Sequence, residues 1–419
     1  MIGGLKSMVD PAQGDGKYCL FSGMFSRRRW ASGILVLGMV QGCGLPEHSA
    51  QVPNGGHSRL DTVDLPATPV DNQGRFGICW AYGTIGLIES NYKRLSGVDV
   101  NLSEEALAFY FLSEHIASII RESVSFAEFF QQTSRGFNEG YFARITEAKK
   151  APGQLDAFDL VQRYGVVPES AWNYKITTGE QRSDLMGELR RKSIRYLSGR
   201  DLAAVTVQEV MDNIMVGEGV FPSRPPDTFV FQGAMATAVD FSQRILGFKP
   251  TDYVAVEVQS EADLDPWIGA VKRALASGYT VPFGFPINVQ RIKDNSFGSD
   301  GVSLDDPIAF VADGGHLVLV TDFVNLGGRE GRVSDAELAA ELSRPSSDLD
   351  HLRFKNSWGL GAKTDGDGRL VSSSPDGYYS LSRGYLVGAA RAAAKGFLPL
   401  NAVVPLKVME SSEGRDGVR

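Results

Sequence analysis

Apolar positions in the first half of the chain recur with the period of a helix. From Ile78 to Leu95 they return every three or four residues, which places them on one helical face, and Gly97 is a typical helix stop. Ser103 is a suitable N-cap and precedes two glutamates, which predicts a second helix through Leu112. Residues 155–165, "LDAFDLVQRYG", predict a third amphipathic helix that ends at a glycine.

The pattern changes beyond residue 250, where β-branched and aromatic runs are bounded by turn residues. These runs are "DYVAVEVQ", "YTVPFGFPI", "HLVLVTDFV", "LRFKNSW" and "GYYSLS". Between the two patterns, residues 175–250 are mixed and mostly helical, with a proline-rich break at "PSRPPD". The chain is therefore helix-rich first and strand-rich later, which predicts an α+β fold with two lobes.

The N-terminal residues have the pattern of a targeting segment. Three consecutive arginines, starting at Arg27, precede the apolar stretch "ASGILVLGMVQG", which is too short to span a membrane, and Cys43 follows. The sequence "VQGC" resembles a bacterial lipoprotein box, in which the cysteine carries lipid. We therefore expect residues 1–43 to be a signal peptide with a lipoprotein box; an ordinary signal peptide cut nearby is the alternative. Residues 44–65 are rich in Gly, Pro and polar residues and predict a tether.

Composition and charge are those of an ordinary globular protein. The 419 residues are 43% apolar and 22% charged, and they suffice for two compact domains or for one with insertions. The formal net charge is −8, and no Lys/Arg-rich run occurs in the body of the chain, which argues against a nucleic-acid groove. An acidic surface favours solubility and says little about function.

The cysteine content directs attention to one residue. The chain has three cysteines, at positions 19, 43 and 79. If Cys19 leaves with the signal peptide and Cys43 carries lipid, Cys79 is the remaining thiol. Oxidising compartments normally pair or discard cysteines, so a single exported thiol suggests that Cys79 is kept for its chemistry.

A cysteine nucleophile needs a thiolate, which a helix N-terminus and a neighbouring imidazolium both favour. Cys79 stands at the start of the first predicted helix, and His316 in "DGGHLVLVTDF" opens a predicted strand where its ring can face a cleft. A core histidine satisfied by backbone groups is the alternative for His316. His115 lies on a predicted helix and is expected to be structural or exposed, and His351 is expected in a solvated loop.

Further groups can complete such a site. Asn356 in "RFKNSWG" can accept a hydrogen bond from the imidazole and orient it, and Trp358 can shield that bond from water. The backbone N–H of Cys79 and the side-chain amide of Gln73 are candidate oxyanion donors. Each residue has a simpler interpretation, since an Asn–Ser pair can end a strand and a Gln–Gly pair can form a turn.

Taken together, these motifs resemble the papain-like cysteine peptidases. The stretches "PVDNQGRFGICWAY", "NLSEEAL", "GGHLVLVTDF" and "FKNSWG…GYYSLS" match that family in order and spacing over roughly residues 66–175 and 251–395. The resemblance implies a helical left lobe carrying the nucleophile Cys79 and a β-rich right lobe carrying the base His316, with the active-site cleft between them. It further implies that Asn356 orients His316, that Gln73 contributes to the oxyanion hole and that Trp358 shields the His–Asn pair.

Several positions depart from the family pattern. Phe76 stands where many relatives have a disulfide cysteine, and Ile78 is bulkier than the usual residue before the nucleophile. The glycine pair of the substrate wall is reduced to "PG", which leaves Gly153 as its candidate member. The chain has no room between Cys43 and residue 66 for a long inhibitory propeptide. This feature and the stretch "YGVVPES" make the chain similar to the bleomycin-hydrolase and aminopeptidase branch.

We expect a peptidase domain over residues 66–400, followed by a C-terminal tail at 401–419. The domain contains a helical insertion at about 175–250 and a smaller one at about 327–350, which either cap the cleft or decorate the lobes. The stretch "DGDGRLVSSSPDG", residues 365–377, lacks the acidic spacing of a calcium loop and predicts a hairpin loop.

The sequence therefore predicts a cysteine peptidase that acts through a thioester acyl-enzyme and needs no cofactor or metal. Its expected partners are a peptide or protein substrate and, through an N-terminal lipid, a membrane; the oligomeric state stays open. We expect it in the bacterial cell envelope, facing the periplasm or the exterior. The alternatives are a papain-fold amidase or acyltransferase, which would form the same thioester, and a non-catalytic relative that binds peptides.

Overall fold

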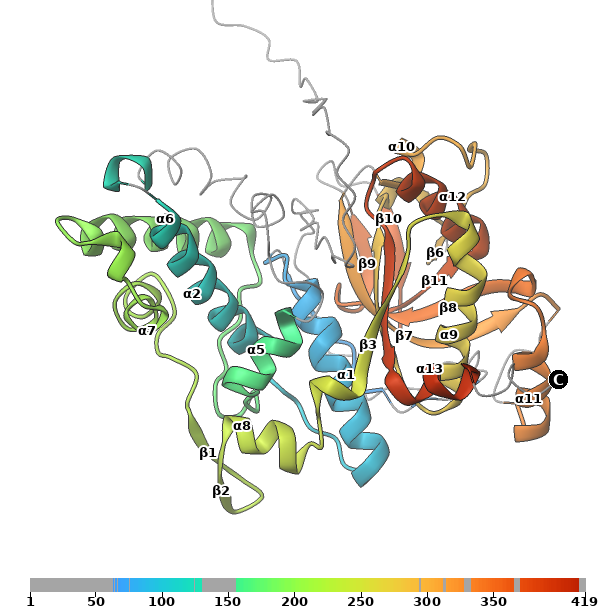
Figure 1. The fold of residues 1–419 in the computed structure, drawn as a ribbon, viewed down its shortest axis with the longest axis horizontal. Helices are drawn as coiled ribbons and strands as arrows, with labels where there is room; N and C mark the ends of the chain where they lie inside the picture. Colours follow the sequence, from blue (N-terminus) through green and yellow to red (C-terminus); the bar gives the residue numbers. More distant parts are fainter. Residues whose placement is uncertain are drawn as a thin grey trace, which may run out of the picture. The chain divides into compact units, whose positions relative to one another are not determined.

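The fold is a mixture of helices and sheet arranged as two lobes, each with its own hydrophobic core (Figure 1). The structure is a computed structural model. It describes the following residues: 63, 65, 67–74, 76–123, 125–129, 156–293, 295–311, 314–327, 333–364 and 370–413. The predicted α+β class is confirmed.

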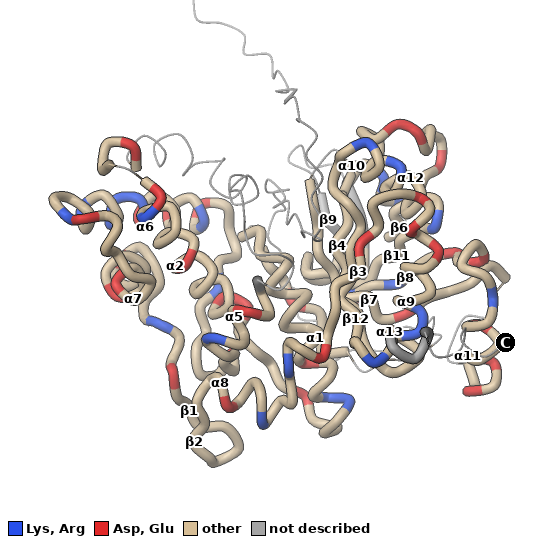
Figure 2. The backbone as a smooth tube through the Cα atoms, in the orientation of Figure 1, with Lys and Arg blue, Asp and Glu red and all other residues tan. Residues whose placement is uncertain are grey.

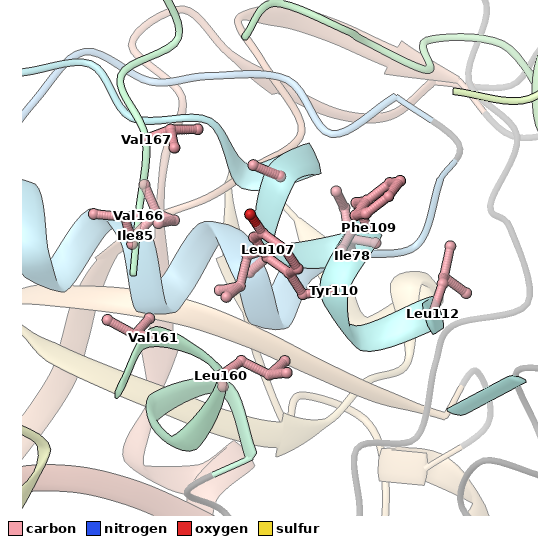
Figure 3. Packing of buried hydrophobic residues seen from close by; sticks show 14 of the residues in the cluster. Ile78, Ile85, Leu107, Phe109, Tyr110, Leu112, Leu160, Val161, Val166 and Val167 are labelled. Atoms are coloured by element: carbon pink, nitrogen blue, oxygen red, sulfur yellow. The ribbon is translucent and has the colours of Figure 1, made fainter. Parts of the chain in front are cut away.

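The first lobe is helical. Its helices are α1 (Cys79–Ser96), α2 (Glu104–Glu122), α5 (Asp156–Tyr164), α6 (Gly179–Leu197), α7 (Val207–Val210) and α8 (Ala238–Asp240). Apolar side chains of α1, α2, α5 and the residues that follow α5 converge in its core, as Figure 3 shows for Ile85, Leu107, Leu160 and Val166. No helix in the described part of the chain is long and apolar enough to cross a membrane.

Local sequence chemistry sets the ends of the first two helices. Gly97 adopts a left-handed φ of 71° and caps α1, where a side chain would be strained. The Ser103 hydroxyl accepts a hydrogen bond from the Ala106 N–H and caps the start of α2. Both boundaries were predicted, but α2 continues to Glu122 rather than ending at Leu112, because its apolar face carries on into the core.

The second lobe is built on an eight-stranded sheet with the order β3-β12-β4-β7-β8-β11-β6-β5. Its strands are β3 (Tyr253–Val258), β4 (Val281–Pro286), β5 (Ile292–Lys293), β6 (Ser296–Phe297), β7 (Gly315–Asn325), β8 (Leu349–Lys355), β11 (Tyr378–Ser382) and β12 (Leu400–Pro405). The pairing is antiparallel except between β11 and β6. Each of the five predicted strand runs overlaps one of these strands.

Helices accompany the sheet and share its core. They are α9 (Leu264–Ala276), α10 (Ile308–Val311), α11 (Asp335–Ser343), α12 (Arg383–Ala394) and α13 (Leu406–Glu413). Apolar residues of α9 and α12, including Trp267, Ile268 and Tyr385, belong to the same buried cluster as the central strands. A separate hairpin pairs β9 (Gly361–Thr364) with β10 (Leu370–Ser374). Residues 370–374, part of the stretch predicted as a hairpin loop, therefore form a strand, and residues 365–369 lie outside the described part.

The C-terminal boundary differs from the prediction. Residues 401–405 are not a tail but belong to β12, which pairs with both β3 and β4 inside the sheet. The run "LNAVVP" is short, and its strand partners lie more than a hundred residues away, so nothing local identified it. His351, expected in a loop, lies in β8 opposite Val324 of β7.

The segment 175–250 is mostly helical, as predicted, with one addition. Between α7 and α8 a hairpin joins β1 (Thr228–Phe231) to β2 (Ala234–Thr237), and its turn contains Gln232 and Gly233, both with positive φ. The smaller insertion contains α11, which a Ser334 capping box starts. Acidic and basic residues are interspersed over the described elements of both lobes (Figure 2).

Helix α1 of the first lobe packs directly on strand β7 of the second lobe. This contact joins the two lobes. Two glycines of α1 make this approach possible. A Cβ on Gly83 would lie 1.9 Å from Leu317 Cδ2, and a Cβ on Gly86 would lie 3.0 Å from Leu319 Cδ2. Because Leu317 and Leu319 are buried, they have little room to move aside.

We therefore expect Gly83→Ala to destabilise the protein, although alanine is the better helix former. Overpacking should outweigh the gain in helix propensity and leave a net loss of roughly 1–2 kcal/mol in the free energy of unfolding. Gly187→Ala on α6 is the matched control, because the only atom within 4 Å of its added Cβ is the guanidinium Nη1 of Arg191, at 3.7 Å. The control should gain about 0.5–1 kcal/mol. Urea unfolding measures both; equal stabilisation would contradict the packing argument.

Candidate active site

Cys79 is the first residue of α1, where it can use the helix N-terminus. The N-cap residue Ile78 makes no side-chain capping hydrogen bond, and the first turn carries no acidic residue. The partial positive charge of the free N–H groups therefore acts on the thiol and favours its ionised form. Cys79 is a free cysteine and only 2% exposed.

His316 is the second residue of β7 and lies where this strand meets the start of α1. The backbone of Leu317, its neighbour, makes a hydrogen bond to the Cys79 side chain. His316 pairs with Phe285 of β4 and is 3% exposed, so the structure shows a site closed to solvent. Its Nδ1 is buried without a hydrogen-bond partner among the described residues. This nitrogen remains available to a thiol proton.

Asn356 follows β8 directly and holds the other nitrogen of the ring. Its Oδ1 lies 2.8 Å from His316 Nε2 and also accepts from the Ser357 N–H at 2.8 Å. The ring of Trp358 stacks on His316 with centroids 5.0 Å apart, and Phe285 meets the ring edge-on at 5.9 Å. The hydrogen bond and the two aromatic contacts fix the orientation of the imidazole.

Gln73 joins this group through Ser357, a residue that the sequence analysis did not single out. The Ser357 hydroxyl donates to Gln73 Oε1 at 2.6 Å, and the Gln73 N–H donates to the Ser357 carbonyl at 2.8 Å. The carbonyl end of the amide is thus occupied, which leaves the NH₂ end as the donor. A contact across 284 residues has no local pattern that would reveal it.

Burial sets the ionisation of the Cys79 thiol and the His316 imidazole. It raises the pKa of the Cys79 thiol to about 11, against the opposing backbone hydrogen bonds from Leu317, Trp80 and Cys79 itself. Burial also lowers the pKa of His316 to about 4, although Asn356 favours the charged ring. Near neutral pH the closed site therefore holds a neutral thiol beside a neutral imidazole, which is the proton-accepting form of histidine.

The remaining predicted positions fall into two groups. Gly153 and Cys43 lie outside the described residues, as do most of the tether and the N-terminal segment. Phe76 and Ile78 are buried in the helical core, where Figure 3 places Ile78. Within the described residues, no group of three or more His, Cys, Asp or Glu side chains is arranged to hold a metal ion.

Comparison with known proteins gives short sequence matches. The chain is 35% identical over 81 residues to "Cysteine proteinase 2" of Zea mays and 36% identical over 74 residues to the "Oryzain gamma chain" of Oryza sativa subsp. japonica. These matches cover 17% and 15% of this chain, and the chain spans about a fifth of the length of these relatives, 21% and 20%. No family model matches. The sequence matches support the resemblance to papain-like cysteine peptidases.

Solved structures are also similar to the chain, at low sequence identity. Procathepsin L 3 from the larval midgut of Tenebrio molitor is 15% identical with a TM-score of 0.34, covering 89% of this chain and 76% of its own. The bromelain protease of Ananas comosus, in complex with the E64 inhibitor, is 15% identical with a TM-score of 0.33, covering 81% and 93%.

Behind Gln73 lies a group of buried carboxylates at the start of α2. Glu105 is 1% exposed, and its Oε1 accepts from the Tyr82 hydroxyl at 3.4 Å. Burial raises the pKa of Glu105 to about 7; Lys175 opposes this, whereas Asp71 and Glu169 add to it. The folded protein therefore binds this proton more tightly than the unfolded chain does.

We expect Glu105→Gln to stabilise the protein at pH 8 by up to about 3 kcal/mol, because a neutral amide replaces a buried carboxylate. The advantage should shrink as pH falls from about 7 towards 4.5, since the wild-type carboxyl then takes up its proton. Chemical unfolding from pH 5 to 8 measures the effect. Exposed Glu218→Gln is the control and should stay within about 0.5 kcal/mol. A difference that does not depend on pH would contradict the assignment.

Proposed function

We propose that the chain is a papain-like cysteine peptidase. The observation that carries the proposal is the disposition of His316. Asn356 holds its Nε2, while its Nδ1 is buried beside the start of α1 and has no hydrogen-bond partner among the described residues. A histidine kept only for the core would be expected to satisfy both nitrogens. The sequence matches to plant cysteine proteinases support the same class.

The proposed reaction has two stages. His316 Nδ1 takes the thiol proton while the Cys79 sulfur bonds to the carbonyl carbon of a peptide. The C–N bond then breaks, and His316 returns the proton to the departing amine, which leaves a thioester. In the second stage His316 takes a proton from water, the oxygen attacks the thioester, and the sulfur leaves and is reprotonated.

Gln73 and the backbone N–H of Cys79 would stabilise the oxyanion of both stages. Such donors are effective because they are already fixed when the charge develops. The hydrogen bond from Ser357 to Gln73 provides this fixation. Asn356 would act through the imidazole by holding its tautomer and by favouring its protonated form.

We further propose that, within the papain-like peptidases, this chain is related to the bleomycin-hydrolase and aminopeptidase branch. The short interval between Cys43 and residue 66 supports this, as does the stretch at 164–170. In the structure this stretch lies against the start of α2, where the Ser103 N–H donates to the Val167 carbonyl at 2.9 Å. The proposed substrate is a peptide or protein.

A thiol-directed epoxide inhibitor tests the proposed activation of Cys79. The wild-type protein should be labelled at neutral pH, Cys79→Ala should not be labelled, and His316→Ala should react at least about 10²-fold more slowly. His351→Ala is the matched control, because this histidine pairs with exposed Asp350 on β8 and should leave the rate unchanged. Mass spectrometry of the labelled protein gives the rates.

Equal labelling of wild type and His316→Ala would refute the activated pair, and unlabelled wild type would favour the non-catalytic relative. Product analysis with and without an added amine separates the remaining classes. Hydrolysis alone supports a peptidase, whereas transfer of the acyl group to the amine supports an acyltransferase.

We also propose that the protein is a lipoprotein of the bacterial cell envelope, anchored through Cys43 and facing the periplasm or the exterior. Cys43→Ser should then move the protein from the membrane fraction to the soluble fraction, because the lipid attachment atom is lost. Cys19→Ser, which alters a cysteine inside the signal peptide, should leave the partition unchanged. Fractionation followed by immunoblotting measures this, and a membrane-bound Cys43→Ser protein would contradict the anchor.

A further inference from the structure

The loop that presents Gln73 is held by both lobes. We refer to residues 71–74 as the oxyanion loop. On the β-rich side, Asn72 forms a backbone bridge with Trp358, and the Gly359 N–H donates to the Asp71 carbonyl at 3.2 Å. These contacts attach the oxyanion loop to the residues that follow Asn356.

On the helical side, the oxyanion loop rests on the residues that open the insertion at 175–250. Lys175 Nζ lies 2.7 Å from Asp71 Oδ2 and 3.1 Å from Glu169 Oε1. Gly74 has a φ of +55°, and a Cβ there would lie 2.5 Å from the Thr177 carbonyl oxygen. The loop and the insertion are therefore in direct backbone contact, and only glycine fits at position 74.

The insertion is itself fixed at this point. The Thr177 N–H donates to Gln181 Oε1 at 2.9 Å, and the Thr178 side chain completes a capping box with the same glutamine at the start of α6. Helix α6 thus anchors Thr177 and Thr178, which follow Lys175 closely in the sequence. The side chain of Lys175 is only 22% exposed, so these neighbours restrict its position.

Lys175 balances the carboxylates of Asp71 and Glu169 next to the oxyanion loop. Glu104 Oε2 lies 4.0 Å from its Nζ, and both Glu104 and Glu105 are buried. Burial opposes the charged ammonium, but Asp71 and Glu104 outweigh it and raise the pKa of Lys175, so the cation persists. Without the ammonium, the Asp71 carboxylate would lose its ion-pair partner and the attraction that holds it at its present position.

We propose that Lys175 is a positioning residue for the oxyanion donor Gln73, and that the insertion at 175–250 serves catalysis by holding the oxyanion loop from the helical side. This inference rests on the proposed function. It assigns a role to the insertion that differs from both capping the cleft and decorating the lobe. Because Lys175 does not touch the reacting atoms, it acts through Asp71 and the backbone of the oxyanion loop.

The consequence for catalysis is specific. Gln73 would bind the oxyanion of the transition state more strongly than the ground-state carbonyl. Misplacing Gln73 should therefore lower kcat more than it changes KM. Removal of an oxyanion donor typically costs about 10²–10³ in kcat. A shift of the loop costs less than removal, and we expect a loss of about tenfold.

A double-mutant cycle on the full-length protein tests the proposal with a fluorogenic peptide as substrate. Lys175→Met should lower kcat about tenfold with little change in KM, and Lys175→Arg should retain most of the activity because it keeps the cation. In a Gln73→Ala background, Lys175→Met should cost less than about twofold further, since its effect passes through Gln73. Arg224→Met, which breaks the Arg224–Asp212 pair elsewhere in the insertion, is the control and should match wild type.

The outcomes separate the two hypotheses. Wild type that hydrolyses no peptide refutes the proposed function. Active wild type with an unchanged Lys175→Met refutes the positioning role, as does an equal loss in the wild-type and Gln73→Ala backgrounds. If Lys175→Met does not fold, Asp71→Asn breaks the same pair while removing a negative charge, and the same cycle is run with it. An Asp71→Asn protein with wild-type kcat would then overturn the proposal.

Discussion

The close approach of α1 to β7 is the constraint on which the site depends. Glycines at positions 83 and 86 bring the helix so near the strand that a methyl group would collide with Leu317 or Leu319. The first residue of the same helix is Cys79, and the strand residue that reaches it is Leu317, the neighbour of His316. One packing contact between the lobes therefore sets the separation of Cys79 and His316, and rigid secondary structure on both sides maintains it.

This packing has an electrostatic consequence. A thiol and an imidazole that are almost fully buried are both held neutral, because charge is costly away from water. The stacked ring of Trp358 and the edge-on contact with Phe285 shield the imidazole, and the hydrogen bond to Asn356 favours its protonated form. Near neutral pH the Cys79 sulfur is therefore protonated, and the Nδ1 of His316 is an unprotonated hydrogen-bond acceptor. Transfer between them creates two charges that stabilise each other in a medium of low dielectric constant.

What could be predicted from the sequence reflects how far each interaction reaches along the chain. Gly97 and Ser103 act on backbone groups within a few residues, so the end of α1 and the start of α2 were predicted correctly. Cys79, His316, Asn356 and Gln73 stand in motifs whose order and spacing indicated a site, and the structure places all four at one junction. Ser357 and Lys175 were missed because they act on residues 284 and 104 positions away. The strand β12 was missed because its partners also lie more than a hundred positions away, and a short apolar run does not identify them.

The segment 67–74, which precedes α1, explains how distant residues come to share one site. Lys355, adjacent to Asn356, donates to the Thr68 hydroxyl at 2.9 Å, and Thr68 donates to Glu89 of α1 at 2.7 Å. A few residues further on, the same segment bonds to Ser357 on one side and to Lys175 on the other. The segment thus links α1, the end of β8 and the insertion. A change in the relative position of the lobes would disturb these bonds together, so the donor amide of Gln73 and the orienting amide of Asn356 are held in register by one stretch of chain. Precise placement of the Gln73 amide, the proposed oxyanion donor, then requires no rigidity in the loop itself, because both flanking lobes supply it.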